Sequence, residues 1–206
     1  MLCGIKSNTE KQIGGAYYMA IKIYIDQGHN PVNPNAGAEG NGLREQDITY
    51  NIGQLLAQRL RQSGNYEVRL SRPTPETQLG TSNASSLRVR VQDANSWGAD
   101  YFISLHTNAS SNSSANGVEA YAYARNTPAF ELGEDIVDGI ADAVGVRNRG
   151  MKTRPGLYVL KRTAMPAVLV ELGFITNPRE ASLMSNSPNL YADGIYNGIV
   201  DFTGLG

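Results

Sequence analysis

Short apolar runs alternate with amphipathic segments along most of the chain. The runs predicted to be strands are Ile21–Asp26, Tyr66–Leu70, Tyr101–His106, Gly117–Ala124, Leu157–Lys161 and Ala167–Glu171. Strands that alternate with helical patterns are typical of an α/β fold with a parallel or mostly parallel sheet. We therefore expect a single α/β domain, a mostly parallel twisted sheet flanked by helices, with its functional site at the carboxyl ends of the strands.

Helices are predicted where apolar residues recur three and four positions apart. These segments are Leu43–Gln62, Ser85–Trp97, Pro128–Val144 and Leu190–Phe202. A further helix should start at Asn177-Pro178-Arg179-Glu180, which has a capping Asn, then Pro, and Glu three residues after the cap. The Asn- and Ser-rich tract Thr107–Gly117 is expected to be a flexible surface loop. The pattern shows no internal repeat, linker or second domain.

The two histidines of the chain each follow or close a predicted strand. His29 comes just after Ile21–Asp26, and His106 ends Tyr101–His106. Because the carboxyl ends of parallel strands face one common crevice, we expect both imidazoles to lie there. Two neutral imidazoles delivered from different strands favour a metal site. The alternative for each histidine is a hydrogen-bonded structural role.

A third metal ligand should be a carboxylate, since Cys3 is the only cysteine and excludes a thiolate cluster. Glu39, Glu45 and Asp47 all follow the first histidine closely. Glu45 is favoured because it precedes Ile48 by three residues and so projects from the core-facing side of the first helical turn. Asp47 points away from this apolar stripe, and Glu39 lies in a Gly-rich loop. The alternative for Glu45 is a carboxylate that only stabilises the helix dipole.

A hydrolytic metal site also needs a base, and Glu171 is the best candidate. It ends a continuous apolar run whose carboxyl end should share the crevice. Burial would raise its pKa toward the range that suits a general base. The alternative is a carboxylate paired with Arg154 or Arg162. Asp26, at the end of another strand, is interpreted as a residue that orients an imidazole.

Charge and composition narrow the function further. A formal net charge of −1 and scattered arginines give no basic surface for nucleic acid. No apolar stretch approaches the roughly 20 residues that a membrane span needs. Residues 1–19 are polar and lack the apolar run of a signal peptide, so we expect a leader or expression remnant there and a catalytic domain over residues 20–206.

Four segments together resemble a known family. They are Ile25-Asp26-Gln27-Gly28-His29, Gly42-Leu43-Arg44-Glu45, Ser104-Leu105-His106-Thr107-Asn108-Ala109 and Val170-Glu171-Leu172-Gly173-Phe174-Ile175-Thr176-Asn177. In this order they resemble the zinc-dependent N-acetylmuramoyl-L-alanine amidases of bacterial cell walls. The resemblance extends from about Ile21 to Phe202. The family position of Asn108 implies that it lines the crevice. Arg88, in a helix that resembles the family's, is interpreted as a solvated residue.

The resemblance implies both a cofactor and a substrate. It implies one Zn²⁺ held by His29, Glu45 and His106, with Glu171 as the catalytic acid/base. It also implies cleavage of the amide between the lactyl group of N-acetylmuramic acid and L-alanine of the peptidoglycan stem peptide, the activity of an autolysin or endolysin. The bacterial cell wall would be the site of action. With no export signal visible, we expect the protein to stay in the cytoplasm until lysis or to be released by another route.

Two other functions fit the same residues. One is a zinc peptidase that cuts a different bond within the stem peptide, and the other is an inactive metal-bearing domain that binds the cell wall. Glu171 argues against the second, because binding alone does not need a buried base. No wall-binding repeat module is visible in the sequence.

Overall fold

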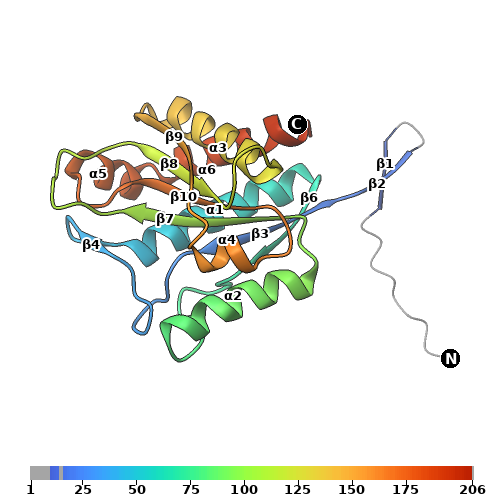
Figure 1. Cartoon of the computed structure of the whole chain (residues 1–206). Coiled ribbons are helices and arrows are strands. Elements are labelled where there is room, and N and C mark those ends of the chain that lie inside the picture. Colours follow the sequence, from blue (N-terminus) through green and yellow to red (C-terminus); the bar gives the residue numbers. More distant parts are fainter. Residues whose placement is uncertain (1–9, 14–15, 206) are drawn as a thin grey trace.

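The computed structural model describes residues 10–13 and 16–205 (Figure 1). The strands are β1 (Glu10–Ile13), β2 (Ala16–Met19), β3 (Ile21–Gln27), β4 (Glu39–Gly40), β5 (Leu43–Arg44), β6 (Tyr66–Leu70), β7 (Tyr101–Asn108), β8 (Val118–Ala122), β9 (Asn148–Thr153) and β10 (Ala167–Phe174). The helices are α1 (Glu45–Ser63), α2 (Asn83–Trp97), α3 (Pro128–Val144), α4 (Tyr158–Arg162), α5 (Pro178–Asn186) and α6 (Pro188–Thr203).

The main sheet has the strand order β6-β3-β7-β10-β8-β9. Strands β6, β3, β7 and β10 are parallel, β8 is antiparallel to β10, and β9 is parallel to β8. This confirms the mostly parallel α/β fold. Strand β7 pairs with β10 so that His106 stands beside Glu171 in the register. Both predicted strand-end residues therefore share one face of the sheet, at the carboxyl ends of neighbouring strands.

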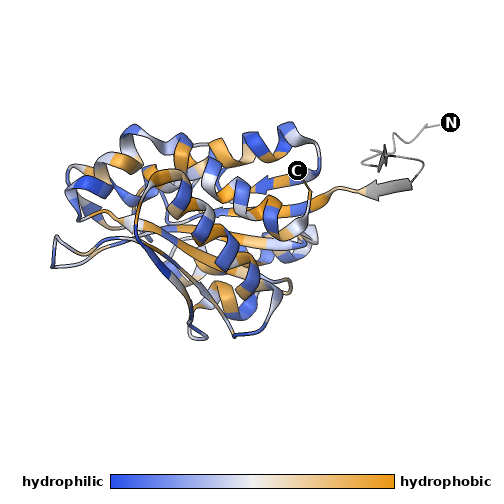
Figure 2. Ribbon diagram, turned by 90° about the horizontal axis from the view of Figure 1, so that it is seen from above, coloured by the Kyte–Doolittle hydropathy of each residue, from blue (hydrophilic) through white to orange (hydrophobic). Residues whose placement is uncertain are grey.

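Helices cover both faces of the sheet (Figure 1). On one face α1, α3 and α6 bury Ile52, Ile136 and Ile195 against the strands. On the other face α2 and α4 bury Val91 and Leu160. Figure 2 shows the apolar residues concentrated in the strands and on the sides of the helices that face them. Burial of these apolar surfaces is the main force that holds the three layers together.

The helix boundaries follow from local sequence signals. Helix α3 begins at Pro128, the predicted first residue, and the Thr127 side chain caps it by accepting a hydrogen bond from the Phe130 amide. Helix α5 begins at Pro178 after Asn177, whose side chain accepts from two amides of the first turn. Both helix starts confirm the sequence prediction, because the caps satisfy amides that have no partner within the helix.

Before β10, one prediction was wrong and one strand was not predicted. Leu157–Lys161 was expected to be a strand, but α4 occupies Tyr158–Arg162 because the adjacent apolar residues Val159 and Leu160 both face the core under a short helix. Strand β9, Asn148–Thr153, was missed. It is polar and half exposed, as suits an edge strand that pairs only with β8.

The Asn- and Ser-rich tract is only partly a loop. Its first two residues, Thr107 and Asn108, continue β7, and the loop after them contains a turn in which the Ala115 amide donates to the Asn112 carbonyl oxygen. The Asn177 side chain donates to two backbone carbonyls of this loop. The loop is thereby tied to the start of α5.

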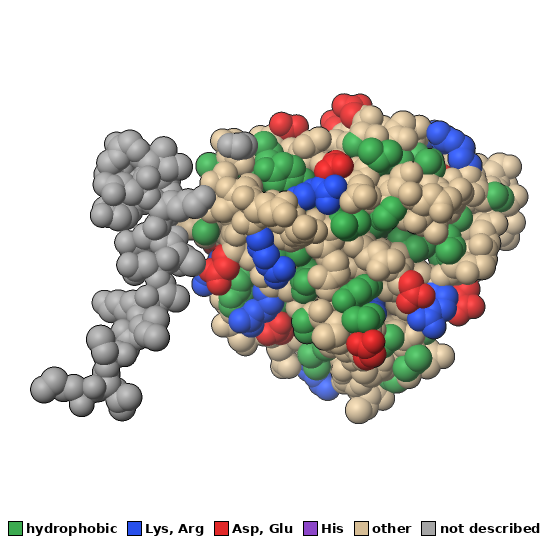
Figure 3. Space-filling model, turned by 180° about the vertical axis from the view of Figure 1, so that it is seen from behind, with side chains coloured by type: hydrophobic (Ala, Val, Ile, Leu, Met, Phe, Trp, Pro, Cys, Tyr) green, Lys and Arg blue, Asp and Glu red, His purple; other side chains and the backbone are tan. Residues whose placement is uncertain are grey.

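The mixture of charges on the surface agrees with the formal net charge of −1. On the face shown in Figure 3, acidic and basic side chains are interspersed among neutral and apolar ones. None of the helices in the described part of the chain combines the length and apolar character needed to cross a lipid bilayer.

Helices α3 and α6 cross at unusually short range through glycines. A Cβ atom on Gly139 would lie 2.3 Å from the Gly194 carbonyl oxygen, and one on Gly198 would lie 2.4 Å from the Asp135 carbonyl oxygen. Both obstacles are backbone atoms, which cannot turn aside as a flexible side chain can. The close crossing therefore requires glycine at these positions.

Replacing Gly198 with Ala should push the two helices apart and lower the free energy of unfolding by about 1–3 kcal/mol. Gly156→Ala is the matched control, because its Cβ atom would meet no atom within 4 Å. Urea unfolding measures both variants, and equal midpoints would show that the crossing tolerates a methyl group.

Candidate metal centre and active site

His29 lies two residues beyond β3 in a left-handed backbone conformation, with φ of 67°. Few residues other than glycine adopt this conformation, so neighbouring contacts must hold it. Arg90 of α2 supplies them: its guanidinium donates to the His29 carbonyl oxygen at 2.5 Å and to the Gln27 carbonyl oxygen at 2.7 Å. The buried side chain of Arg90 thus holds the loop that carries His29 in place.

Arg90 is itself paired with a buried carboxylate. Its Nη1 donates to Oδ1 of Asp26 at 2.5 Å, and the Ser104 hydroxyl donates to the other oxygen at 2.7 Å. Burial alone would raise the pKa of Asp26, but the charge and hydrogen bond of Arg90 outweigh it and leave that pKa below its usual value. Asp26 was expected to orient an imidazole. It instead reaches His29 through Arg90 and the backbone.

Glu45 is the first residue of α1 and lies between the two histidines. Its Oε1 is 3.2 Å from His29 Nε2 and 3.1 Å from His106 Nδ1. The same oxygen accepts from the Thr107 amide at 2.9 Å, and Oε2 accepts from the Ala38 amide at 2.9 Å. These backbone donors hold the carboxylate rigidly in place. The structure therefore brings together the three residues that the sequence predicts as ligands.

The three side chains are strongly coupled. Burial alone would raise the pKa of Glu45, but hydrogen bonds from His106 and His29 leave it well below its usual value. Burial alone would lower the pKa of His106, but the Glu45 carboxylate outweighs it and raises that pKa. Glu45 and His106 thus each favour the charged form of the other.

The cluster has the chemistry of a divalent metal site. One ligand atom from each of His29, Glu45 and His106 lies within 4.8 Å of the others. Nδ1 of His29 is buried and has no hydrogen-bond partner among the described residues. Two imidazole nitrogens and one carboxylate oxygen are a ligand set typical of catalytic zinc, which leaves a fourth position open for water or substrate. The residues present therefore fit this metal.

Glu171 lies beside this cluster on the same face of the sheet, in register with His106 of β7 and Glu119 of β8. Burial, helped by the negative charges of Glu45 and Glu119, raises the pKa of Glu171 to about 7, although the charge of His106 opposes the shift. Its Oε2 is buried without a hydrogen-bond partner among the described residues. An unpaired carboxylate that titrates near neutral pH suits a general base.

The alternatives considered for these positions behave as surface residues. Asp47 is exposed and pairs with Arg44, the residue just before α1, and Glu39 lies exposed on β4. Arg88 is exposed, as expected for a solvated residue. Neither Arg154 nor Arg162 forms an ion pair with Glu171 among the described residues.

Sequence reasoning missed two residues near the site, Arg90 and Glu119. Arg90 shares a buried stripe of α2 with Ser86 and Ala94, each four residues away, and this spacing could have marked it as an inward-facing charge. Glu119 is the one charged residue of β8, whose other residues are apolar or aromatic. It accepts a hydrogen bond from Asn108 at 3.1 Å. Asn108 thus lies beside the predicted crevice.

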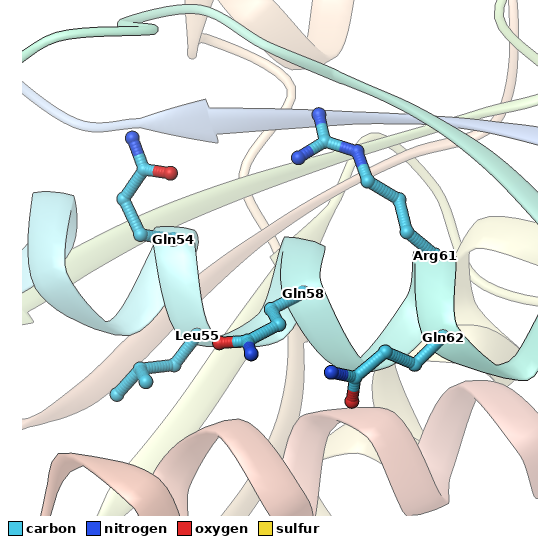
Figure 4. A pocket seen from close by; sticks show the side chains of 5 residues that line it. All are labelled: Gln54, Leu55, Gln58, Arg61 and Gln62. Carbon is cyan, nitrogen blue, oxygen red and sulfur yellow. The ribbon is translucent and has the colours of Figure 1, made fainter.

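A pocket on the outer surface of α1 is unrelated to this chemistry. Its lining residues all belong to the helix beyond its second turn: Gln54, Leu55, Gln58, Arg61 and Gln62 (Figure 4). Arg61 is the only charged side chain among them, and its Nη2 donates to the Val68 carbonyl oxygen at 2.9 Å. The pocket therefore offers no acid, base or nucleophile.

Comparison with known proteins assigns the chain to a family. The family model described as N-acetylmuramoyl-L-alanine amidase matches residues 23–201, nearly the whole described domain. The chain belongs to the N-acetylmuramoyl-L-alanine amidase family. All four predicted site residues lie within the matched range, so the structure places the cluster inside the amidase domain.

Individual relatives of this amidase domain agree. N-acetylmuramoyl-L-alanine amidase LytC of Bacillus subtilis (strain 168) is 38% identical over 87% of this chain and 35% of its own length. The amidase CwlM of Bacillus licheniformis is 37% identical over 81% of this chain and 62% of its own length. The chain thus spans about a third to two thirds of the length of these curated relatives. The crystal structure of the N-acetylmuramoyl-L-alanine amidase from Clostridium difficile 630 superposes with a TM-score of 0.80 and 30% identity, over 90% of this chain and 97% of that chain.

Loss of the Arg90 side chain should be strongly destabilising, because it leaves Asp26 as an unpaired buried charge. We expect Arg90→Met to lower the free energy of unfolding by about 3–5 kcal/mol. Adding Asp26→Asn should recover part of this loss by removing the uncompensated charge. Urea unfolding measures the series.

Arg88→Met is the matched control on the same helix, since its exposed side chain should change stability by less than about 0.5 kcal/mol. An Arg90→Met variant as stable as Arg88→Met would contradict the anchoring role of the buried ion pair.

Proposed function

We propose that this protein is a zinc-dependent hydrolase of peptidoglycan that cleaves the amide between N-acetylmuramic acid and L-alanine of the stem peptide. Membership of the amidase family supports the substrate class. The observation that carries the catalytic proposal is the Glu171 carboxylate beside the His29, Glu45 and His106 cluster, because its Oε2 is buried with no hydrogen-bond partner among the described residues. A bacterial cell wall is the proposed site of action, and residues 20–206 are the proposed catalytic domain.

Each side chain has a distinct part in the proposed reaction. His29, Glu45 and His106 would hold the zinc ion, which would supply a Lewis acid that polarises the scissile carbonyl. Glu171 takes a proton from the attacking water and returns it to the nitrogen of the departing alanine. A base with a pKa near 7 can perform both transfers, because neither its protonated nor its deprotonated form is strongly disfavoured at neutral pH.

Arg90 and Asp26 are proposed to contribute to this reaction only by positioning His29, without contacting the substrate. Their buried ion pair holds the His29 backbone and so fixes the direction of one imidazole. A small misplacement of a ligand or base is costly in catalysis, because the productive geometry must be held within a fraction of an ångström.

The metal ligands can be tested without an activity assay. Purified protein loaded with zinc and dialysed should retain about one zinc ion per chain by elemental analysis, as the three converging donors imply. His106→Ala should retain far less, because it removes one of the three ligands. Asp47→Asn, which removes an exposed carboxylate from the same helical turn as Glu45, is the control and should retain the full amount. Full zinc content in His106→Ala would refute the proposed ligand set.

The base can be tested with Glu171→Gln, which removes the charge and nearly preserves the shape. Turnover should fall by about 10²–10⁴-fold, the usual contribution of a general base, while zinc content stays unchanged. Mass spectrometry of digested peptidoglycan measures the products. Near-normal turnover in this variant would mean that another group takes the proton.

The same digests separate the competing functions. The proposed amidase releases intact stem peptides with a free N-terminal alanine. A zinc peptidase would instead release shortened peptides, and a wall-binding domain would release none.

A further inference from the structure

The face of the sheet that carries Glu171 continues across β8 to a group of cations on and just after β9. Glu119 of β8 stands beside Glu171 in the register, and Tyr121 lies two residues further along the same face. Lys152 of β9 is the register partner of Tyr121. Neighbouring strands are about 4.8 Å apart, so β9 lies only about 10 Å from β10.

Glu119 neutralises only part of the positive charge of its neighbours Arg149 and Lys152. It accepts hydrogen bonds from Arg149 at 2.6 Å, from Lys152 at 2.5 Å and from the Tyr121 hydroxyl at 2.6 Å. Burial would raise the pKa of Glu119, but hydrogen bonds led by that of Lys152 lower it to about 2, so the group is a single negative charge at neutral pH. Two cations therefore share one carboxylate.

Arg154 adds a third cation with no counter-ion. Its guanidinium carbon lies 5.3 Å from the centroid of the Tyr121 ring, and Lys152 Nζ lies 6.0 Å from the same centroid. Arg154 is exposed, and it forms no ion pair in the described part of the chain. Stacking on the ring orients the planar guanidinium while its N–H donors stay free to bind a planar anion.

The proposed reaction decides which part of the substrate passes over these cations. Glu171 returns its proton to the departing nitrogen, so the peptide half of the substrate must begin beside Glu171. His106, a proposed metal ligand, lies on β7 on one side of Glu171, and the cations lie on and just after β9, beyond β8 on the other side. The peptide half therefore leads from Glu171 toward the strand that Arg154 follows.

We infer that Arg154, supported by Lys152 and the Tyr121 ring, forms a subsite for a carboxylate carried by the stem peptide directly after its L-alanine. The inference rests on the proposed amidase function and deepens it, since it assigns a specificity determinant to the peptide half. Arginine is suited to this role because its fork of donors matches a carboxylate with two parallel hydrogen bonds.

Two substrates that differ in one group test the subsite. N-acetylmuramoyl-L-alanyl-D-isoglutamate carries a free carboxylate after the alanine, and N-acetylmuramoyl-L-alanyl-D-isoglutamine carries an amide in its place. Wild-type enzyme should show the higher kcat/KM with the carboxylate substrate. Arg154→Gln should lower kcat/KM by about tenfold for that substrate, mainly through KM, and by less than about twofold for the amide substrate. Arg154→Lys should restore part of the preference, because it keeps the charge.

Arg125→Gln is the matched control. Arg125 is also exposed and also lies over an aromatic ring, with its guanidinium 5.5 Å from the Phe130 centroid, but that ring belongs to α3 and not to the group around Tyr121. This variant should keep the wild-type preference. Assays at alkaline pH, where Glu171 is deprotonated in every variant, remove the effect of Arg154 on the Glu171 pKa.

Equal losses on both substrates in Arg154→Gln, or a wild-type enzyme without preference, would overturn the subsite and leave the amidase function intact. Failure of wild-type enzyme to release alanyl peptides from either substrate would instead overturn the proposed function, and the subsite with it.

Discussion

The buried ion pair between Asp26 and Arg90 is the interaction on which the site depends. Asp26 comes from β3, Arg90 comes from α2, and the pair reaches the backbone of the loop that carries His29. A buried charge pair contributes little net stability compared with apolar packing, since both charges lose their hydration. Its value here is geometric: it ties a helix, a strand and a loop to one arrangement, with His29 held at a positive φ.

Three glutamates around the site show how position sets the behaviour of one residue type. Glu45 meets two imidazoles and two backbone amides and remains an anion. Glu119 meets four hydrogen-bond donors that include two cations, and it also remains an anion. Glu171 has no such partners among the described residues, and burial of its carboxylate raises its pKa to about 7. Only the last can exchange a proton at neutral pH, so the division between ligand, counter-ion and proposed base follows from neighbours.

The register of the sheet connects the metal centre with the inferred peptide subsite. Side chains of register partners point to the same face, so His106, Glu171 and Glu119 form a row across β7, β10 and β8. The antiparallel insertion of β8 puts Glu119 and Tyr121 beside β10, and β9 adds Lys152 at the edge. The row thus passes from the proposed metal ligands through the proposed base to the cations, in the order in which the proposed amide substrate would present its carbonyl, its nitrogen and its peptide half.

The sequence by itself determined the α/β class, most element boundaries and the candidate residues His29, Glu45, His106 and Glu171. It could do so because strand and helix periodicities differ, and because parallel strands deliver their carboxyl-end residues to a common edge. Only the tertiary structure decided the rest. Strand β9 is polar and depends on pairing with β8, and the apolar pair in α4 forms a helix because both residues must face the core. The spacing of α2 can mark Arg90 as inward-facing, but the roles of Arg90 and Glu119 come from ion pairs with residues far along the chain, which no local pattern encodes.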